Sequence, residues 1–597
     1  MSEFLTDLKR SHDCGALRAS DAGKRVVLFG WVASRRDHGG LVFIDLRDRA
    51  GITQVAFEPD QGAEAFALAG ELRSEFCIGI TGTVAERGGK KNPNLATGEI
   101  EIKADQLTIF SRAETPPFEI TDSTLAGESV RLKHRYLDLR RPALQKNFLV
   151  RSQIYQTTRR WLSQNGFAEI ETPFMVKYTP GGARNFLVPS RLNPNQFYAL
   201  AESPQIFKQL FMVSGFDRYF QIVRCFRDED LRLDRQPEFT QIDLEMSFVV
   251  EEDVQGIIEG LIGSLWKDVL GVDVKLPLPR LTYAEAMGKY GSDKPDLRFD
   301  LPLCDLTDLC RTHDGGGVGL IGSALKTPTA IVKGWRLPAA QATKLARSDL
   351  DKLEEFAKGF GAGGLARARI GAGGAWTQTP MKTMTDALRT GINAAAGLEE
   401  GDLLFLQFGA KKLVNAVLGA LRLHVANKLE VVPKDVWRFA WVTDFPLFEQ
   451  GDDGHLVASH HPFTAPNPDD LERLESDPGS VRARAYDLTL NGNEIAGGSI
   501  RIHRSDVQAR VFRALGLSDE DAKAKFGFLL EAFKYGPPPH GGIAAGVDRL
   551  AMLLCGAESL RDVIAFPKTQ KGTDLMTDAP SNVSKRQLDE LHIALKE

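Results

Sequence analysis

The sequence predicts an α+β protein of several domains: a small N-terminal β-barrel, a second domain of strands and helices, and an α+β domain inserted into the second. Three observations support this prediction. At 597 residues the chain is too long for a single hydrophobic core. The apolar periodicity is strand-like over 25–110 and becomes helix-like from residue 147. A Gly-rich and Ala-rich stretch at 293–419 then separates two regions that share an aromatic, strand-rich texture.

The composition narrows the class of protein. Hydrophobic residues make up 43% and charged residues 26% of the chain, which is typical of a soluble globular protein. No apolar run of about 18 residues indicates a membrane span, and the N-terminus has no apolar core that would predict a secretory signal. The 6 cysteines are scattered without a CxxC pair. Neither a disulfide framework nor a structural zinc site is therefore expected, and a reducing cytoplasm fits.

The first domain is expected to be an OB-fold. Segments within 25–110 alternate apolar and polar residues, with glycines at the joints, and give about five short strands. A proline-containing linker follows, and then a helix that ends at Asn165-Gly166. The predicted boundaries are 1–112 for the barrel, 113–142 for a hinge, 143–292 and 420–560 for the two parts of the second domain, 293–419 for the insertion, and 561–597 for a C-terminal extension.

A basic run could mark a nucleic-acid partner even though the formal net charge is −5, because phosphates are met by local patches. Residues 131–160 contain nine Lys or Arg against one acid, Asp138. A solvated helix face is the more common explanation of such a run. The run alone therefore does not decide between the two interpretations.

The insertion contains a G-x-G-x-x-G pattern at Gly317, Gly319 and Gly322. A dinucleotide site needs a strand before this pattern and a helix after it. No clear strand precedes it, and Pro328 falls where the helix should run. We therefore expect these glycines to serve turns and close packing.

Three separated segments place charged residues inside apolar strands, where burial without partners is costly. In the first, 224–247, a strand, a polar loop and a returning strand follow one another. Gln241, Asp243 and Glu245 alternate on the returning strand and therefore point to one face. Arg227, at the end of the partner strand, could bind a phosphate through two hydrogen bonds. This pattern indicates a binding surface rather than a core.

The other two segments carry similar chemistry. In 486–503, Asp487 and Glu494 flank a turn at 491–493, and Arg501 follows. Paired carboxylates near a phosphate-binding arginine are typical of Mg²⁺ that bridges phosphate oxygens. In 541–554, small residues permit close approach of the backbone before Asp548-Arg549 opens an amphipathic helix. Each segment also has a structural explanation, since Asp–Arg pairs often tie a helix to a sheet. That explanation is harder to sustain for all three together.

With these segments, the chain resembles the class II aminoacyl-tRNA synthetases, and within them the bacterial-type aspartyl-tRNA synthetases. The resemblance covers about residues 3 to 580. It is carried by GFAEIETP (166–173), which matches motif 1, by the segments at 224–245 and 541–554, which match motifs 2 and 3, and by RRDHGGLVFIDLRD, RYLDLRR, SPQIFKQL, HHPFTAP and NEIAGGSIRIH.

The resemblance implies an OB-fold that binds the anticodon, a class II catalytic domain on an antiparallel sheet, and an inserted domain related to a tRNA amidotransferase subunit. It also implies a homodimer with Pro173 at the interface. The implied substrates are ATP, L-aspartate and tRNA-Asp, with Mg²⁺ as cofactor. The implied reaction forms aspartyl-adenylate and then transfers aspartate to the 3′ end of the tRNA.

Residue roles follow where the motifs match. The resemblance implies catalytic roles for Arg227, Arg549 and Glu494. For ATP it implies Arg227, Asp228, Glu229, Gln236, Glu494, Gly546, Val547, Asp548 and Arg549. For aspartate it implies Ser203, Gln205, Lys208, Arg227, Asp243, His460 and Arg501. For the metal it implies Asp487 and Glu494, and for anticodon binding and discrimination His38, Phe43 and Gln54.

Two details sharpen these expectations. Lys208 and Arg501 would bring two positive charges to one small pocket, so that a neutral carboxamide would leave both cations underpaired. In the loop over the aspartate site, many relatives read TPEGARD, whereas this chain reads TPGGARN with Gly181 in place of the glutamate. A direct contact from that loop side chain to the amino acid is therefore not expected.

His38 leads to the expectation of dual tRNA specificity. Within the family, discriminating enzymes tend to have leucine at this position and relaxed enzymes histidine. The anticodons GUC for Asp and GUU for Asn differ at one base, and a histidine can donate to, accept from or stack on either C or U. Charging of tRNA-Asn would require a partner amidotransferase. The alternatives are a strictly discriminating enzyme, or a merely polar loop residue at position 38.

Other functions remain as alternatives. A non-catalytic, tRNA-binding relative of the synthetases would be expected to lose the phosphate ligands, which this chain retains at Arg227, Glu494 and Arg549. A tRNA-independent aspartate ligase would need no anticodon barrel. Asparaginyl and lysyl synthetases conflict with a pocket lined by two cations.

Overall fold

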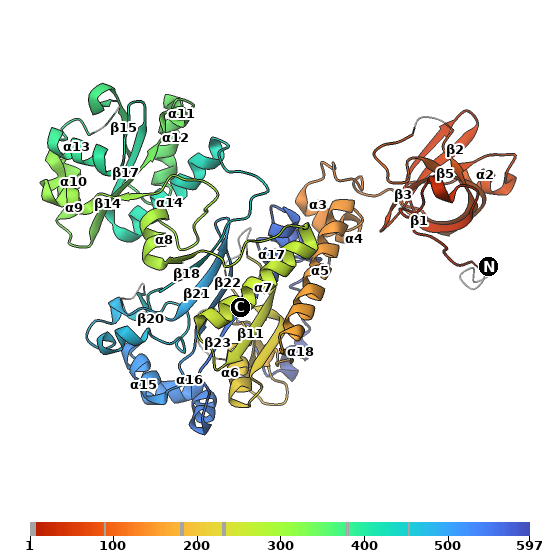
Figure 1. The fold of residues 1–597 in the computed structure, drawn as a ribbon. Coiled ribbons are helices and arrows are strands. Elements are labelled where there is room, and N and C mark those ends of the chain that lie inside the picture. The colour runs from red at the N-terminus through yellow and green to blue at the C-terminus, as the bar shows by residue number, and fades with distance from the viewer. Residues whose placement is uncertain are drawn as a thin grey trace. The chain divides into compact units, whose positions relative to one another are not determined.

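The computed structural model describes residues 8–88, 91–178, 184–229, 235–377, 379, 381–451 and 454–596. The chain divides into two compact units, residues 1–153 with 230–237 and 551–597, and residues 154–229 with 238–550 (Figure 1). None of the helices in these described ranges is long and apolar enough to cross a membrane. Gly181, which stands where many relatives have a glutamate, lies outside the described residues.

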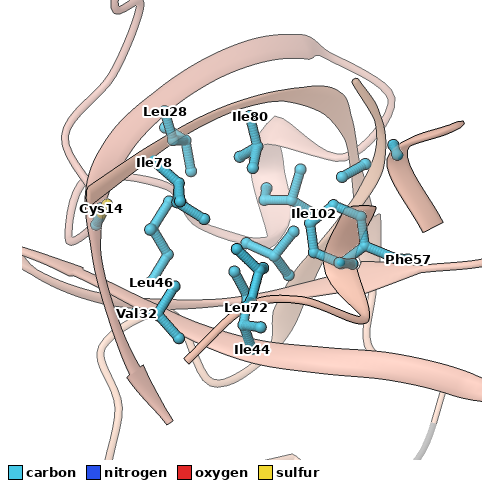
Figure 2. Close-up of a cluster of buried hydrophobic side chains, with 14 of the residues drawn as sticks. Cys14, Leu28, Val32, Ile44, Leu46, Phe57, Leu72, Ile78, Ile80 and Ile102 are labelled. Atoms are coloured by element: carbon cyan, nitrogen blue, oxygen red, sulfur yellow. The ribbon is translucent and has the colours of Figure 1, made fainter. Parts of the chain in front are cut away.

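The first unit contains the predicted barrel. Its strands close in the order β1-β2-β3-β5-β4. They are β1 (Arg25–His38), β2 (Leu41–Asp48), β3 (Gly51–Phe57), β4 (Cys77–Glu86) and β5 (Ile100–Ser111), with helix α2 (Ala63–Ala69) between β3 and β4. Alternate residues of each strand point inward, as Leu28, Ile44, Ile78 and Ile102 do in Figure 2. This alternation confirms the sequence-based prediction of an OB-fold.

The basic run at 131–160 is divided between buried and exposed side chains: Arg135 and Arg151 are buried, whereas Lys133, Lys146, Arg159 and Arg160 are exposed. It spans α3 (Glu128–Lys133), α4 (Arg135–Asp138) and most of α5 (Pro142–Gln164). Arg135 is buried, pairs with Asp138 at 2.8 Å and donates to three backbone carbonyls of 561–565. Arg140 pairs with the buried Glu75 of the barrel at 2.7 Å and lies over the Trp31 ring. Arg135 and Arg140 therefore form their ion pairs within the first unit.

The second unit is built on an eight-stranded sheet in the order β12-β18-β21-β22-β23-β11-β10-β6. The strands are β12 (Arg280–Thr282), β18 (Phe439–Thr443), β21 (Ala485–Leu490), β22 (Asn493–Ile500), β23 (His540–Gly546), β11 (Glu238–Ser247), β10 (Arg218–Phe226) and β6 (Ala168–Glu169). All neighbours are antiparallel except the two edge pairs, β12–β18 and β10–β6. The predicted antiparallel catalytic sheet is confirmed.

Helices complete this unit. Helix α7 (Glu251–Leu270) lies along α5 (Figure 1), where Gly260 leaves the space that the Trp161 ring fills. Helix α6 (Gln205–Val213) packs on β10 and β11, and α17 (Val547–Cys555) begins directly after β23. Helices α8 (Tyr283–Tyr290), α15 (Ser505–Ala514) and α16 (Asp519–Ala532) and the small sheet β7-β9-β8, formed by Met175–Val176, Phe197–Leu200 and Leu187–Pro189, also belong to it.

The inserted region forms a sheet of its own. Its five strands follow the order β13-β14-β17-β15-β16: β13 (Cys304–Asp305), β14 (Ala330–Leu337), β17 (Leu403–Ala410), β15 (Ala366–Ile370) and β16 (Trp376–Thr377). The main helices that pack with it are α9 (Thr307–Thr312), α10 (Gly319–Leu325), α12 (Arg347–Lys358), α13 (Asp386–Ala395) and α14 (Lys411–Lys428). In the G-x-G-x-x-G pattern, Gly317 lies in the turn before α10 at φ +77°, whereas Gly319 and Gly322 belong to α10 itself. Helix α9 and a short turn lead into the pattern in place of the strand that a dinucleotide site needs, which supports the interpretation of Gly317 as a turn residue.

Two buried cations join the insertion to the catalytic sheet region. Lys333 of β14 donates to the carbonyls of Met287 and Gly288 at the end of α8 and to the Asn415 amide oxygen. Arg422 of α14 donates to the carbonyls of Asp296, Phe299 and Leu301. Each cation satisfies backbone carbonyls that would otherwise be buried without partners.

The buried Glu75 provides a test of how the barrel is held to the hinge. It accepts from Arg47 at 2.7 Å and from Arg140 at 2.7 Å. We expect Glu75→Gln to destabilise the first unit by about 3 kcal/mol, because the buried Arg47 and the partly exposed Arg140 lose their shared anion. Urea unfolding of the full chain measures this change. Glu99→Gln, which removes an exposed pair with Lys91, is the control and should leave the transition unchanged; equal curves for all three proteins would contradict the expectation.

Candidate functional site

The strand register places the charged residues of the predicted segments on one face of the central sheet. Asp243 of β11 lies opposite Ala544 of β23, which lies opposite Gly497 of β22, which lies opposite Asp487 of β21. Directly opposed residues of antiparallel strands point to the same face. Asp243 and Asp487 therefore stand at the two ends of a row whose middle positions are glycine and alanine, which leaves a trough between them.

The neighbouring row on the same face has the same form. Glu245 of β11 lies opposite Gly542 of β23, which lies opposite Ser499 of β22. Arg501 follows the end of β22 and hydrogen-bonds to the backbone of His540 through its own backbone N–H. The three sequence segments singled out for their buried charges thus converge on four adjacent strands.

Asp487 and Glu494 come together over Gly497. A Cβ atom built at Gly497 would lie 2.7 Å from Asp487 Oδ1 and 3.5 Å from Glu494 Oε1. Burial, followed by the charge of Asp487, raises the pKa of Glu494, and Arg549 opposes the shift. Arg549 Nη1 donates to the Glu494 carbonyl. A cation between these carboxylates would relieve the repulsion that raises the pKa.

The donor set fits Mg²⁺. Two carboxylates with no sulfur or imidazole ligand required are what Mg²⁺ uses together with phosphate oxygens and water. The described residues contain no group of three or more acidic, His or Cys side chains placed to hold a metal ion.

Arg227 follows β10 and lies over the Phe239 ring, with its guanidinium carbon 5.0 Å from the ring centre. Its buried Nε has no hydrogen-bond partner among the described residues. An unmatched guanidinium N–H beside the trough is suited to an anionic ligand. Asp228 and Glu229 follow at half-buried positions, and Asp228 pairs with Arg184 at 2.9 Å.

Two of the predicted ATP contacts have other partners in the structure. The Asp548 carboxylate accepts from the Thr240 backbone N–H at 2.8 Å and so fixes the start of α17 to β11. The predicted backbone of 546–548 lies at this same start of α17. Gln236 belongs to the first unit, where its amide forms two hydrogen bonds with the backbone of Lys568, at 2.9 and 3.1 Å. Their roles towards ATP remain predictions.

A cluster of four buried charges lies below the other end of the trough. Lys208 Nζ is 2.7 Å from Asp243 Oδ1 and 3.1 Å from Glu245 Oε2. Arg501 contacts the same Glu245 through Nε at 2.9 Å and Nη2 at 3.2 Å, and donates to Ser499 Oγ at 2.6 Å. All four charged side chains are at most 5% exposed. Lys208 and Arg501 are brought together as predicted.

The two cations have anionic partners within the protein. Glu245 lies between them, and Asp243 contacts Lys208, so the pocket contains two carboxylates for two cations. Burial alone would raise the pKa of Glu245, but the charges of Arg501 and Lys208 outweigh it and lower the pKa to about 2. The sequence had placed Glu245 on the correct face, but without a role, because alternation shows the direction of a side chain and not its partner.

A cavity of about 240 Å³ is lined in part by His461, whose pKa is lowered by burial and by the nearby charges of Arg501 and Lys208. Ser203 and Gln205, both predicted to bind aspartate, line it together with Asn185 and His461. Gln205 Nε2 and Asn185 Oδ1 are buried and have no hydrogen-bond partner among the described residues. These unmatched atoms provide one donor and one acceptor for a small polar ligand.

The two adjacent histidines lie in different surroundings. His460 faces Asp487, with 3.8 Å between Nε2 and Oδ1. Burial lowers its pKa, but the hydrogen bond and charge of Asp487 outweigh burial and raise the pKa overall. His461 is the one beside the cationic cluster: burial, then the charges of Arg501 and Lys208, lower its pKa to about 3. Its Nδ1 accepts from the Phe463 backbone N–H at 3.3 Å, so neutral His461 carries its proton on Nε2.

His461 was not predicted from the sequence. HHPFTAP offers two histidines in succession, and only the packing of Phe463 and Arg501 determines which of them is beside Lys208. The predicted contact of His460 with the amino acid remains a prediction.

The predicted anticodon residues of the barrel differ in exposure, since Gln54 is buried and His38 is exposed. Phe43 of β2 is half-buried, and Gln54 of β3 lies opposite Asp45 of β2. The Gln54 amide already interacts with Arg36, Arg87 and Glu101. His38 ends β1, is exposed, and precedes a two-residue turn in which Gly39 and Gly40 both have positive φ. A turn of this type needs glycine or asparagine, and it holds His38 at the tip of the hairpin.

Comparison with known proteins agrees with this geometry. Residues 127–570 match the model of class II tRNA synthetases (D, K and N), and residues 26–110 match the OB-fold nucleic-acid-binding domain. The chain belongs to the class II aminoacyl-tRNA synthetases.

Its relatives specify the similarity further. The chain is 60% identical over 599 residues to the aspartate–tRNA(Asp/Asn) ligase of Anaeromyxobacter dehalogenans, with 99% of each chain covered. It is 52% identical over 595 residues to the ligase of the same name from Syntrophotalea carbinolica, again with 99% of each covered.

Solved structures show the same fold. The asparaginyl-tRNA synthetase of Pyrococcus horikoshii with asparaginyl-adenylate has a TM-score of 0.58 at 18% identity, and covers 94% of this chain and 98% of its own. The aspartyl-tRNA synthetase of Entamoeba histolytica has a TM-score of 0.58 at 19% identity, and covers 94% and 92%.

A synthetase of this class uses ATP, and Arg549 is the cation next to the carboxylate pair. We expect Arg549→Ala to lower kcat/KM for ATP in pyrophosphate exchange by about 100-fold or more, because a fixed cation that meets phosphate charge is lost. The control is Arg504→Ala, which removes an exposed arginine paired with Asp506 and should leave kcat/KM unchanged. The structural explanation would be supported instead if Arg549→Ala unfolded while its folded fraction exchanged normally.

Proposed function

We propose that the chain is an ATP-dependent aspartate–tRNA ligase that charges both tRNA-Asp and tRNA-Asn. The observation that carries the choice of amino acid is the buried pair Lys208 and Arg501, next to His461 of the small cavity. The relatives named aspartate–tRNA(Asp/Asn) ligase, at 50–60% identity, support the choice of tRNA, and the barrel supplies a domain to bind it.

Aspartate would bind with its side chain towards the charged cluster. Its side-chain carboxylate would accept from Arg501, whose terminal nitrogens each keep one N–H without a partner among the described residues. The Nε2–H of His461 is a further donor at this end. The substrate ammonium would be received by Asp243 and by the Gln205 side-chain oxygen, with Ser203 beside them. The pocket thus recognises a zwitterion with an extra anion.

The first step joins the α-carboxylate of aspartate to the α-phosphorus of ATP and releases pyrophosphate. This step needs little proton transfer, so positioning and compensation of charge dominate. Arg227 would hold both the α-carboxylate and the α-phosphate, and Arg549 the far phosphates. Asp487 and Glu494 would hold Mg²⁺, which when bound supplies positive charge to the phosphate oxygens.

The second step transfers aspartate to tRNA. The terminal ribose 3′-hydroxyl attacks the carbonyl carbon of the adenylate, the bond to the phosphate oxygen breaks, and AMP leaves. Arg227 would remain beside the phosphate and stabilise the negative charge of the leaving AMP.

Substitution of either cation tests the choice of amino acid. We expect Lys208→Ala and Arg501→Ala each to lower aspartate-dependent pyrophosphate exchange by about 100-fold or more, because the side-chain carboxylate loses a charged partner. Both variants also leave Glu245 buried without one of its cations, so exchange is expressed per folded molecule from circular dichroism. Near-normal exchange in both folded variants would exclude this pocket as the aspartate site.

The tRNA specificity is tested at His38. Wild-type protein is expected to aspartylate transcripts of both tRNA-Asp and tRNA-Asn, because histidine can hydrogen-bond or stack with C or U at the deciding anticodon base. His38→Leu is expected to keep tRNA-Asp activity and to reduce kcat/KM for tRNA-Asn by about 10-fold, the equivalent of one lost base contact. Labelled aspartate on acid-washed tRNA measures both activities. Background charging of tRNA-Asn by wild type would leave a discriminating aspartate–tRNA ligase.

Dual charging would create Asp-tRNA-Asn, which requires conversion by an amidotransferase before it can serve in translation. The proposal therefore includes such a partner enzyme. It also includes a homodimer, in keeping with the motif 1 proline at position 173, and a cytoplasmic location.

A further inference from the structure

Glu245 is the one member of the buried charge cluster to which the proposed reaction gives no task. It is fully buried in the centre of the sheet, where an ionised carboxylate is costly unless it is paired. The hydrogen bonds that pair β11 with its neighbouring strands are made by the backbone, so strand pairing does not require the Glu245 side chain. Its partners are the two cations proposed to meet the substrate.

The neighbouring strand is shaped to admit this carboxylate. Gly542 lies directly opposite Glu245 in the register of β23 and β11. A Cβ atom at Gly542 would lie 1.9 Å from Glu245 Oε2. A glycine is therefore required at this position for the carboxylate to reach Lys208 and Arg501 across the face of the sheet.

The hydrogen bonds show what Glu245 does to each cation. Arg501 uses Nε and Nη2 on Glu245 and Nη1 on Ser499, so its guanidinium plane is fixed and one N–H on each terminal nitrogen stays available. Lys208 is held between Asp243, Glu245 and the Leu244 carbonyl. Without Glu245, each of these flexible cations would lose a contact that restricts its position.

We propose that Glu245 is a positioning residue for amino-acid selection: it anchors Lys208 and Arg501 in the orientation that receives the substrate's side-chain carboxylate, and it keeps the empty pocket near charge neutrality. This inference rests on the proposed function. Binding of aspartate then exchanges partners within the cluster. Asp243 takes the substrate ammonium, Lys208 turns from Asp243 towards the substrate carboxylate, and Glu245 holds both cations throughout.

The consequence is a preference for aspartate over asparagine that depends on Glu245. Asparagine supplies the ammonium for Asp243 but no anion for Lys208, and its amide hydrogens would face the N–H groups of Arg501. A glutamine at 245 removes the anchor, since its amide oxygen can serve one cation while its NH₂ group faces the other. The two cations would then be free to adopt orientations that discriminate less.

Glu245→Gln is the central test. ATP–pyrophosphate exchange with aspartate is expected to show KM for aspartate raised about 100-fold or more, with KM for ATP within about twofold of wild type. The ratio of kcat/KM for aspartate over asparagine is expected to fall at least about 10-fold. A merely structural role would lower the active fraction and leave both KM values and this ratio unchanged.

Glu75→Gln is the matched control. Glu75 is likewise a buried glutamate that bridges two cations, Arg47 and Arg140, but it belongs to the barrel. It should lose stability without any change in the KM for aspartate or in the preference for aspartate. A rise in KM for aspartate in both variants would show that loss of any buried ion pair has this effect, and would overturn the proposal.

Glu245→Asp keeps the inference testable if the glutamine variant does not fold. It retains the charge but withdraws the carboxylate by one methylene, so it can serve only one of the two cations. KM for aspartate is expected to rise at least about 10-fold. Wild-type KM and preference in a folded Glu245→Asp or Glu245→Gln protein would overturn the inference. If the wild-type protein itself shows no aspartate-dependent exchange, the proposed function fails instead.

Discussion

The catalytic sheet depends on one constraint: charged side chains on a sheet face can be buried only where the opposed strand leaves room for them. Gly497 and Gly542 are the positions that meet this constraint. The first lies beneath Asp487 and Glu494, and the second opposite Glu245. Side chains at these two positions would collide with the carboxylates. The small residues of β22 and β23 are thus needed for the carboxylates to be buried on this face of the sheet.

The same constraint organises the chemistry along the face. The carboxylate pair over Gly497, with Arg549 beside it, forms an end suited to phosphate and a divalent cation. The cluster around Glu245 forms an end suited to a zwitterion. Arg227 stands beside the trough between them, with an unmatched N–H. A reaction that joins a carboxylate to a phosphate requires a fixed distance between these two ends. The hydrogen-bonded backbone of adjacent strands in one sheet holds that distance constant.

The sequence was informative where a local pattern has a single structural solution. Alternation over 25–110 gives a barrel, and 491–493 gives a turn with Asn491 and Gly492 at positive φ. Alternation also places Asp243 and Glu245 on one face. The partner of a buried charge cannot be predicted from a local pattern, because it comes from a distant segment of the chain. Glu245, for example, pairs with Lys208 of α6 and with Arg501, which follows β22. The basic run at 131–160 was ambiguous for the same reason, since its Arg140 pairs with Glu75, which lies far away in the sequence and belongs to the barrel.

The two specificities of the protein rest on different cores. The proposed pocket for the amino acid is built on the eight-stranded sheet, and the candidate anticodon residues are held by the closed barrel, whose own buried cluster includes Leu28, Ile44 and Ile102. His38 is exposed at a hairpin tip and packs in neither core. Under the proposed function, a substitution at His38 would change which base is tolerated at little cost in stability, whereas a change at Glu245 would alter a fully buried ion pair. Relaxed recognition of tRNA is therefore physically compatible with strict selection of the amino acid, because the residues proposed to select the amino acid are buried in a core and His38 is not.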